Sequence, residues 1–241
     1  MQIQNVGFIL ILRTFESLNF VKMHIHHIET RPSILNHFIA QVRDCSVQTD
    51  RMRFRRNLER IAEILGYEMS KYLEYREQTV TTPLGEKKVP MLARDMVICS
   101  ILRAGLPFHN GLLNYFDHAE NAFISAYRHH TGTKDEFEIL VEYLSAPSLE
   151  NKTLLLADPM LATGQSFVSV YESLKKLGTP AEVHILAVIG ARPGIALLEK
   201  HFPPETHLWI AAIDDTLNDK GYIVPGLGDA GDLAYGNKLQ H

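Results

Sequence analysis

Cysteine is scarce in this sequence, with only Cys45 and Cys99 among 241 residues. A chain of this length can bury a core large enough to fold without disulfide bonds, so we expect a reducing, cytoplasmic location. An excess of positive charge is also absent, because 24 Lys and Arg residues stand against 28 Asp and Glu residues, a net charge of −4. We therefore expect neither nucleic acid nor a membrane surface as a partner.

Long hydrophobic runs are missing as well. The longest apolar stretch near the start covers residues 6–12 and ends at Arg13, far short of the roughly 18 residues that a transmembrane helix needs. No basic segment precedes this stretch and no Ala-x-Ala-like site follows it, which argues against a signal peptide. Repeats, low-complexity tracts and Pro/Gly/Ser-rich linkers are absent too, so the chain is expected to form one domain.

Two patterns stand out in the first half of the chain. Between Asp50 and Tyr75, apolar residues recur at steps of three or four, which predicts an amphipathic helix with one buried face; they are Phe54, Leu58, Ile61, Leu65, Met69 and Tyr72. The segment Thr79–Pro90 predicts a β-hairpin, because its Thr-Val-Thr-Thr run favours a strand and its Pro-Leu-Gly run favours a turn.

From Met96 onward, short apolar runs alternate with amphipathic stretches. The apolar runs predict buried strands at Met96–Ile101, Ala122–Ala126, Thr153–Ala157, Val183–Ile189 and His207–Ile213. The stretches between them predict helices at Pro107–Phe116, Gln165–Leu177 and Pro193–Lys200. This alternation predicts an α/β fold with a parallel sheet flanked by helices, in which ligands bind beyond the carboxyl ends of the strands.

The strand predicted at Thr153–Ala157 runs into a loop of small and hydroxyl-bearing residues and then into a helix. The loop consists of Asp158, Pro159, Met160, Leu161, Ala162, Thr163, Gly164, Gln165 and Ser166. Free amides at a helix N-terminus and the hydroxyls of Thr163 and Ser166 can bind a phosphate group, while the Asp158 carboxylate can accept hydrogen bonds from two ribose hydroxyls. The loop alone leaves a second interpretation equally open, in which Asp-Pro and Thr-Gly serve only as turn and cap.

Three segments resemble the type I phosphoribosyltransferases, specifically the uracil phosphoribosyltransferase family. Residues 154–166 are similar to that family's phosphoribosyl pyrophosphate loop, Ile101–Leu106 resembles its pyrophosphate loop, and residues 221–232 resemble its uracil-binding segment. The likeness extends from about Arg31 to Lys238. It implies a type I phosphoribosyltransferase-like parallel sheet flanked by helices, with a β-hairpin and a flexible hood over the active site.

The resemblance implies that the protein converts uracil and 5-phosphoribosyl 1-pyrophosphate to UMP and pyrophosphate in pyrimidine salvage. It gives catalytic roles to Asp158, Arg103 and Asp229. It places phosphoribosyl pyrophosphate against Arg103, Arg128, Asp229 and the whole loop from Asp158 to Ser166. It assigns the reading of uracil to backbone groups of Ile223, Gly228 and Ala230, together with Asp229.

Further expectations come from the same resemblance. Mg²⁺ is implied as a cofactor, bound mainly through the substrate rather than by direct protein ligands, and the protein is expected to form a homodimer or a larger homo-oligomer. GTP is a candidate effector, because it activates some members of the family. Since the likeness starts only near Arg31, residues 1–22 are expected to be an N-terminal extension ahead of a single domain over 23–241, with Met23 as the natural start.

Some positions depart from the family pattern. Gln165 stands where a second glycine is usual, Leu233 stands where a basic residue is usual, and the usual hood residues are not recognisable between His129 and Leu144. Two alternatives therefore stay open: a catalytically weakened nucleotide-binding sensor, and a transferase for another nucleobase. Elsewhere, His24, His26 and His27 predict a solvated segment rather than a zinc site. His129 and His130, which follow Arg128, predict a polar loop.

Overall fold

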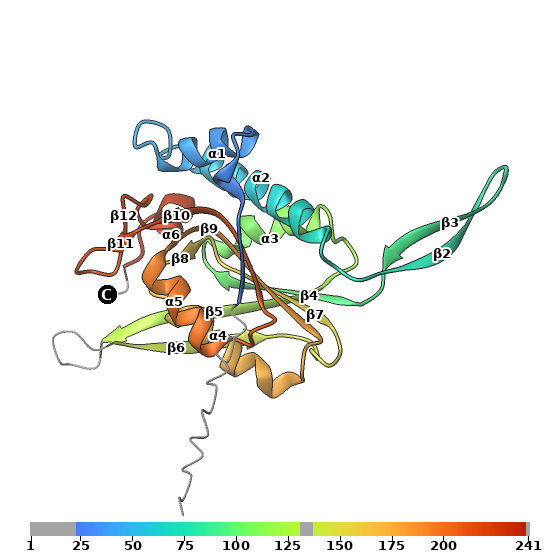
Figure 1. The fold of residues 1–241 in the computed structure, drawn as a ribbon. Coiled ribbons are helices and arrows are strands. Elements are labelled where there is room, and N and C mark those ends of the chain that lie inside the picture. Colours follow the sequence, from blue (N-terminus) through green and yellow to red (C-terminus); the bar gives the residue numbers. More distant parts are fainter. Residues whose placement is uncertain (1–22, 131–136, 240–241) are drawn as a thin grey trace, which may run out of the picture.

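A computed structural model describes residues 23–130 and 137–239, with the side chains of residues 126–142 excepted. Within this part the central sheet has eight strands, in the order β1-β10-β9-β7-β4-β5-β6, with β8 paired to β9 (Figure 1). Its strands are β1 (His24–His27), β4 (Met96–Leu102), β5 (Glu120–His130), β6 (Phe137–Ser145), β7 (Thr153–Ala157), β8 (Met160–Leu161), β9 (Glu182–Ala191) and β10 (His207–Asp214).

Every pair of neighbouring strands in this sheet is parallel except β5 and β6. All the strands predicted from Met96 onward are present, with ends that differ by at most a few residues. The prediction of a parallel α/β sheet is therefore confirmed, and the antiparallel β6 strand adds a mixed edge to it.

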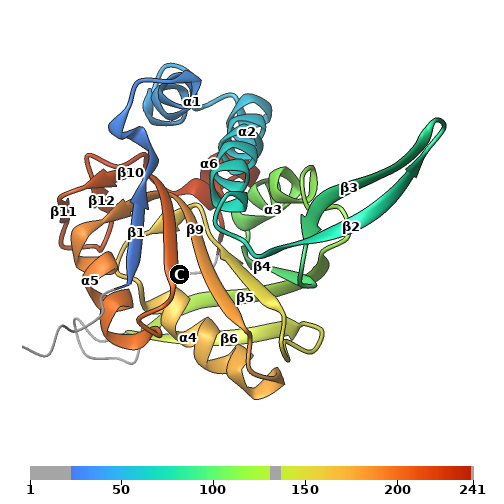
Figure 2. The same cartoon turned by 45° about the vertical axis from the view of Figure 1, so that its right-hand side comes forward.

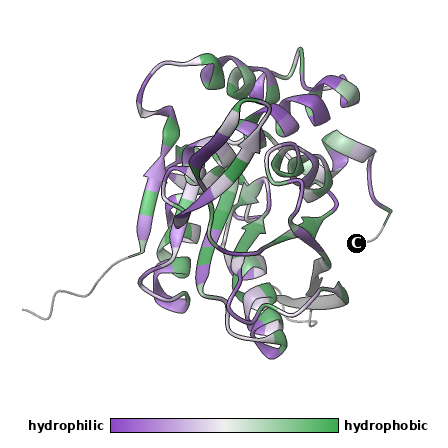
Figure 3. Ribbon diagram, turned by 90° about the vertical axis from the view of Figure 1, so that its right-hand side faces the viewer, coloured by the Kyte–Doolittle hydropathy of each residue, from purple (hydrophilic) through white to green (hydrophobic). Residues whose placement is uncertain are grey.

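Helices cover both faces of the sheet (Figure 2). One face packs against α1 (Ile34–Arg43), α2 (Arg51–Ser70), α3 (Gly105–Leu113) and α6 (Ala230–Tyr235), and the other against α4 (Gln165–Leu174) and α5 (Arg192–His201). Successive strand residues alternate between the two cores: Ile98 belongs to the first, and Val97 and Cys99 belong to the second. Figure 3 shows the hydrophobic segments gathered in the central strands.

The predicted amphipathic helix is α2, and Asp50 caps it by accepting a hydrogen bond from the Arg53 amide at 3.0 Å. Its apolar stripe from Phe54 to Met69 is buried as expected. Tyr72 is an exception, because the helix ends at Ser70 and the Tyr72 side chain is exposed. None of the helices described in residues 23–130 and 137–239 is long and apolar enough to cross a membrane.

The predicted hairpin is confirmed and is longer than expected. Strands β2 (Tyr75–Thr82) and β3 (Gly85–Leu92) pair in register, and nearly all of their residues are exposed. The hairpin projects as an arm from the body of the molecule (Figures 1 and 2).

Two histidine segments are strands. The segment at His24 is an edge strand, in which His24 is exposed as predicted while His26 and His27 are half-buried, and the His26 ring stacks on Trp209 with 3.8 Å between centroids. His129 and His130 do not lie in a loop, because β5 continues to His130 and pairs with β6. Backbone pairing with a neighbouring strand, which a local pattern cannot reveal, accounts for both. The centre of the expected hood, at 131–136, and the expected extension over 1–22 lie outside the described residues.

Candidate active site at the carboxyl edge of the sheet

The polar residues singled out by the sequence gather at one edge of the sheet. Arg103 follows β4 directly and Asp158 follows β7 directly, while Asp214 ends β10. These strands are parallel neighbours or close neighbours, so their carboxyl ends lie side by side. Arg103, Asp158 and Asp214 thus lie at the carboxyl ends of the strands, the edge at which a parallel α/β sheet is expected to bind its ligand.

Asp158 is half-buried at the end of β7, and its Oδ1 accepts a hydrogen bond from the Met160 amide at 3.0 Å. Burial raises the pKa of this carboxyl to about 7, against the effect of the Met160 amide, and the charge of nearby Asp229 adds to the rise. The carboxyl group therefore titrates in the neutral range, where a hydrogen-bonding or cationic partner would favour its ionised form.

The loop after Asp158 turns into α4 through Gly164, whose φ of +83° suits glycine. A Cβ at this position would also meet the Gly194 carbonyl oxygen of α5 at 2.8 Å. The loop backbone is thus held against a neighbouring helix. Gly164 provides no capping side chain, and only the Gln165 amide at the start of α4 has a side-chain acceptor, the Thr163 hydroxyl, so the amides that follow it can bind an anion.

The side chains of this loop divide into two groups. Thr163 and Ser166 are half-buried, and the Thr163 hydroxyl accepts a hydrogen bond from the Gln165 amide at 3.4 Å. Gln165 is exposed, in line with a side chain that does not block the loop. Leu161 is instead wholly buried in the core, so only its backbone can meet a ligand.

Arg103 reaches from β4 to the last motif. Its Nη2 donates to Asp232 Oδ1 at 2.5 Å and its Nη1 donates to the Gly236 carbonyl at 3.0 Å. The guanidinium lies against Gly231, where an added Cβ would be 3.3 Å from Nη2. The pyrophosphate-loop arginine and the C-terminal motif, far apart in the sequence, are thus in direct contact.

Asp229 carries the second carboxylate of the site. Its Oδ1 caps α6 by accepting from the Asp232 amide at 2.9 Å, and its Oδ2 accepts from Lys238 Nζ at 3.0 Å. Burial by itself would raise the pKa of Asp229, but these two donors outweigh it and hold the pKa below its usual range. The site therefore pairs one carboxylate that stays ionised with one, Asp158, that titrates near neutrality.

The segment expected to read uracil has an irregular backbone. Ile223 lies in β12 (Ile223–Val224), which pairs with β11 (Thr216–Leu217), and Ala230 starts α6. Gly226 has a φ of +61°, and a Cβ there would overlap the Ile223 carbonyl. Gly228 is exposed and lines a hollow of about 280 Å³ together with Asp229. Residues 228–229 of this segment thus border an open hollow that Asp232 and Arg51 also line.

Distant side chains hold this segment in place. Asp214 accepts two hydrogen bonds from Arg43, at 2.8 and 3.0 Å, and a third from the Gly226 amide at 2.9 Å. Arg43 also donates to the Gly226 carbonyl at 3.0 Å, and Gln48 donates to the Leu227 carbonyl at 3.2 Å. Burial opposes ionisation of Asp214, yet the donors around it hold its pKa below the usual range.

Sequence reasoning missed Arg43 and Gln48. The helix that carries Arg43 was not predicted, although Ser33 and Asn36 form a capping box at its start, a signal that the sequence does contain. Nothing local connects either residue to residues 226–227. Arg128, which was predicted, lies in β5, and its side chain is outside the described part of the structure.

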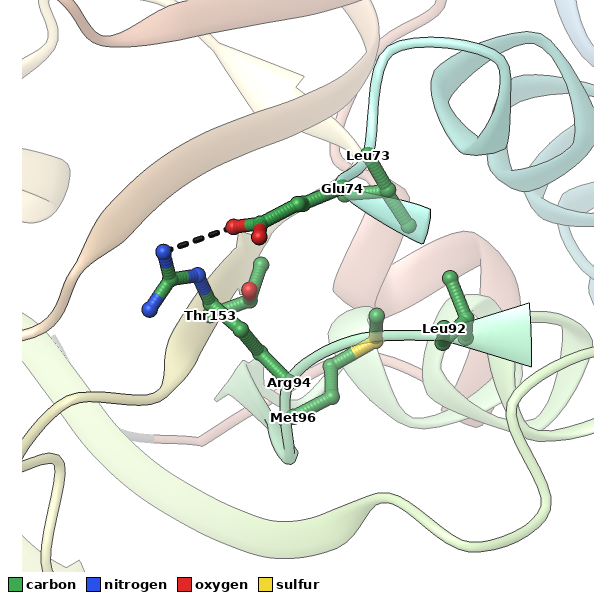
Figure 4. Close-up of a pocket in the computed structure, with 6 residues that line it drawn as sticks. All are labelled: Leu73, Glu74, Leu92, Arg94, Met96 and Thr153. Atoms are coloured by element: carbon green, nitrogen blue, oxygen red, sulfur yellow. Dashed lines mark hydrogen bonds and ion pairs between the residues drawn. The ribbon is translucent and has the colours of Figure 1, made fainter. Parts of the chain in front are cut away.

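A second cavity lies at the opposite end of the sheet (Figure 4). Met96 and Thr153, the first residues of β4 and β7, line it, and an Arg94–Glu74 ion pair of 2.7 Å closes one side. It encloses only about 10 Å³, room for a single water molecule at most. This cavity is therefore too small to hold a substrate.

Comparison with known proteins places the whole chain rather than single residues. Residues 28–237 match the family model described as uracil phosphoribosyltransferase. A uracil phosphoribosyltransferase from Porphyromonas gingivalis is 48% identical over 217 residues, which cover 90% of this chain and 100% of the relative. One from Pyrococcus furiosus is 38% identical, with 90% and 91% covered. The solved structure of the AQ2163 protein from Aquifex aeolicus has a TM-score of 0.79 at 30% identity, with 90% and 100% covered.

Proposed function

Because the chain belongs to the uracil phosphoribosyltransferase family, we propose that it transfers the phosphoribosyl group of 5-phosphoribosyl 1-pyrophosphate to uracil, forming UMP and pyrophosphate in pyrimidine salvage. One observation carries the proposal in the structure. Arg103 is hydrogen-bonded to Asp232 of the C-terminal motif, and the charge of Asp229 acts on Asp158, so the three motifs meet at a single edge of the sheet.

The chemistry asks the protein mainly for positioning and charge stabilisation, since the anomeric carbon develops positive charge as pyrophosphate leaves. The Asp158 carboxylate accepts hydrogen bonds from the ribose hydroxyls. The first amides of α4, with the hydroxyls of Thr163 and Ser166, bind the 5-phosphate. Ionised Asp158 is favoured by these partners, although in the free protein burial raises its pKa to about 7.

Arg103 stabilises the departing pyrophosphate. Its guanidinium now pairs with the Asp232 carboxylate at 2.5 Å, and a carboxylate presents two oxygens to arginine much as a phosphate does. Exchange of Asp232 for a pyrophosphate oxygen would preserve the geometry of the pair. Arg128 is expected to contribute from β5.

The residues of the site fit Mg²⁺ bound mainly through substrate. Asp158 and Asp229 interact electrostatically, and a cation beside them would relieve their repulsion. When bound, Mg²⁺ neutralises charge on the leaving pyrophosphate. Among the residues that the structure describes, no group of three or more His, Cys, Asp or Glu side chains is placed to hold a metal ion.

Base choice follows from backbone recognition at Ile223, Gly228 and Ala230. These groups fix the order of donors and acceptors, so uracil fits whereas cytosine presents an amine where a carbonyl is needed. Mispaired polar groups in a buried site can reject a ligand by factors of about 10⁴. Purines, which are wider than pyrimidines, should not be accepted.

Assays with phosphoribosyl pyrophosphate, Mg²⁺ and each of uracil, cytosine and hypoxanthine test the proposal. Uracil alone should be converted, with release of pyrophosphate. Equal turnover of cytosine or hypoxanthine would favour a transferase for another base, and nucleotide binding without turnover would favour a sensor.

Three finer proposals accompany this function. Self-association into a homodimer or larger assembly is tested by light scattering. Activation by GTP is tested by adding GTP to the uracil assay, and a cytoplasmic location is tested by cell fractionation.

A further inference from the structure

A hydrogen-bonded chain of three side chains lies beside the loop that carries Arg103; Ser100 and His109 are buried and Asn121 is exposed, and none of the roles above uses it. Ser100 Oγ is 2.8 Å from His109 Nδ1, and His109 Nε2 is 2.7 Å from Asn121 Oδ1. Ser100 is 0% exposed and His109 is 1% exposed. Polar groups at such depth are costly unless each is paired, so the chain needs a reason to be there.

The direction of the chain follows from its far end. Asn121 Nδ2 donates to the Ala119 carbonyl at 3.3 Å, which leaves Oδ1 as the acceptor that faces His109. His109 therefore carries its proton on Nε2, and Nδ1 accepts from the Ser100 hydroxyl. Burial lowers the pKa of His109, although the bond to Asn121 opposes this, so the ring stays neutral and can both donate and accept.

The chain spans the pyrophosphate loop. Ser100 lies in β4 before Arg103, His109 lies in α3 after it, and Asn121 belongs to the neighbouring strand β5. Within the loop, a Cβ added to Gly105 would be 3.3 Å from the Ser100 Cβ, so the two arms of the loop approach closely there. The Ser100–His109 bond thus ties together the two ends of the loop that carries Arg103.

A serine, a histidine and an amide in series also resemble a nucleophilic triad. Burial excludes this role, because the Ser100 side chain is wholly enclosed in the core and no substrate can reach it. The chain is therefore suited to holding structure in place.

We propose that His109 is a positioning residue for the proposed transfer reaction, which through Ser100 holds the loop 102–105 so that Arg103 meets the leaving pyrophosphate. This rests on the proposed function of the site. Displacement of a binding group by about 1 Å can lower the reaction rate roughly a hundredfold. Loss of the hydrogen bond that joins the two ends of this loop would therefore move Arg103 enough to weaken its contact with pyrophosphate. Uracil, which is bound by a different segment, should be affected little.

His109→Met tests the proposal, because methionine fills a similar space without the two hydrogen bonds. His184→Met is the matched control. His184 is also buried, at 2% exposed, and accepts a hydrogen bond from Trp209 Nε1 at 3.1 Å, but it lies near the amino end of β9. We expect His109→Met to raise the KM for phosphoribosyl pyrophosphate by about tenfold or more, with the KM for uracil nearly unchanged. His184→Met should lower the melting temperature by a similar amount and leave both KM values unchanged.

Two further variants separate positioning from stability. His109→Gln keeps one donor and one acceptor, and should restore much of the affinity for phosphoribosyl pyrophosphate. Ser100→Ala combined with His109→Met removes both polar partners, so it should recover stability while the raised KM remains. The double variant also carries the test if His109→Met does not fold.

Calorimetry with pyrophosphate gives a readout independent of turnover. Weaker pyrophosphate binding by His109→Met, but not by His184→Met, supports the proposal even if wild type converts no uracil, a result that would count against the proposed function alone. Unchanged pyrophosphate affinity in His109→Met, or equal losses in His184→Met, would overturn the positioning role.

Discussion

The phosphate loop and the uracil segment lie at the same edge of the sheet but are built differently. The phosphate loop, residues 158–166, is formed by one continuous piece of chain: strand β7, a tight turn at Gly164, and helix α4. The segment from Ile223 to Ala230 has little regular structure, and its turn is held by Asp214, Arg43 and Gln48 from other parts of the chain.

Because of this difference, the two halves of the site should respond to different substitutions. The backbone of the phosphate loop should survive the loss of its polar side chains, because the strand and helix at its ends hold it. The uracil segment should respond to substitutions far from it in the sequence. The following predictions probe these two expectations.

Asp158→Asn should give the largest effect. Turnover should fall by about a hundredfold or more, because each hydrogen bond between a charged carboxylate and a ribose hydroxyl contributes about 1.5–3 kcal/mol. Steady-state kinetics with phosphoribosyl pyrophosphate measure this. A near-normal kcat/KM would remove Asp158 from the reaction.

The same variant should keep its fold and gain stability at high pH. Burial raises the pKa of Asp158 to about 7 in the folded protein, above the unfolded value of about 3.9, so the neutral acid favours folding at low pH and this contribution is lost as pH rises through 7. The melting temperature of Asp158→Asn relative to wild type should therefore rise between pH 5 and pH 8. A lower relative melting temperature at pH 8 would contradict the pKa shift.

Arg43→Ala should break the uracil segment without touching the phosphate loop. It leaves the Asp214 carboxylate, 9% exposed, without its charged partner, which costs about 3 kcal/mol of unfolding free energy. Denaturant unfolding measures the loss, and the KM for uracil should rise more than that for phosphoribosyl pyrophosphate. Arg94→Ala is the control, because its pair with Glu74 is 38% and 53% exposed and should contribute about 1 kcal/mol or less.

Arg103→Ala should weaken the binding of phosphoribosyl pyrophosphate and leave the binding of uracil almost unchanged. A bidentate contact between arginine and a phosphate group contributes about 1.5–3 kcal/mol, so affinity for phosphoribosyl pyrophosphate should fall by about 10- to 100-fold with little change for uracil. Calorimetry with each ligand separates the two. Equal losses would show that the contacts of Arg103 with Asp232 and Gly236 matter mainly for holding the C-terminal motif.

Deletion of residues 1–22 should have the smallest effect on both regions. The family likeness begins after this segment, and the matched family model starts at residue 28. Activity and melting temperature should stay close to those of the full chain. A drop of more than a few degrees would show that the segment packs on the core.

Local sequence determined much of this protein. The apolar runs from Met96 onward predicted the parallel strands, because a strand buried on both faces needs apolar residues throughout. The Asp158–Ser166 loop was identifiable because a strand, a turn and a helix start follow one another within a single stretch. The three motifs also carried enough specificity to identify the family before the fold was known.

Tertiary structure alone decided the rest. The His24 strand and the extension of β5 to His130 depend on pairing with strands remote in the sequence, for which the chain carries no local signal. The contacts of Arg43 with Asp214, of Arg103 with Asp232, and of His109 with Ser100 and Asn121 arise only when folding brings separate elements together. A sequence pattern reports which residues can bury or bind, but the partner of a long polar side chain depends on the three-dimensional packing around it.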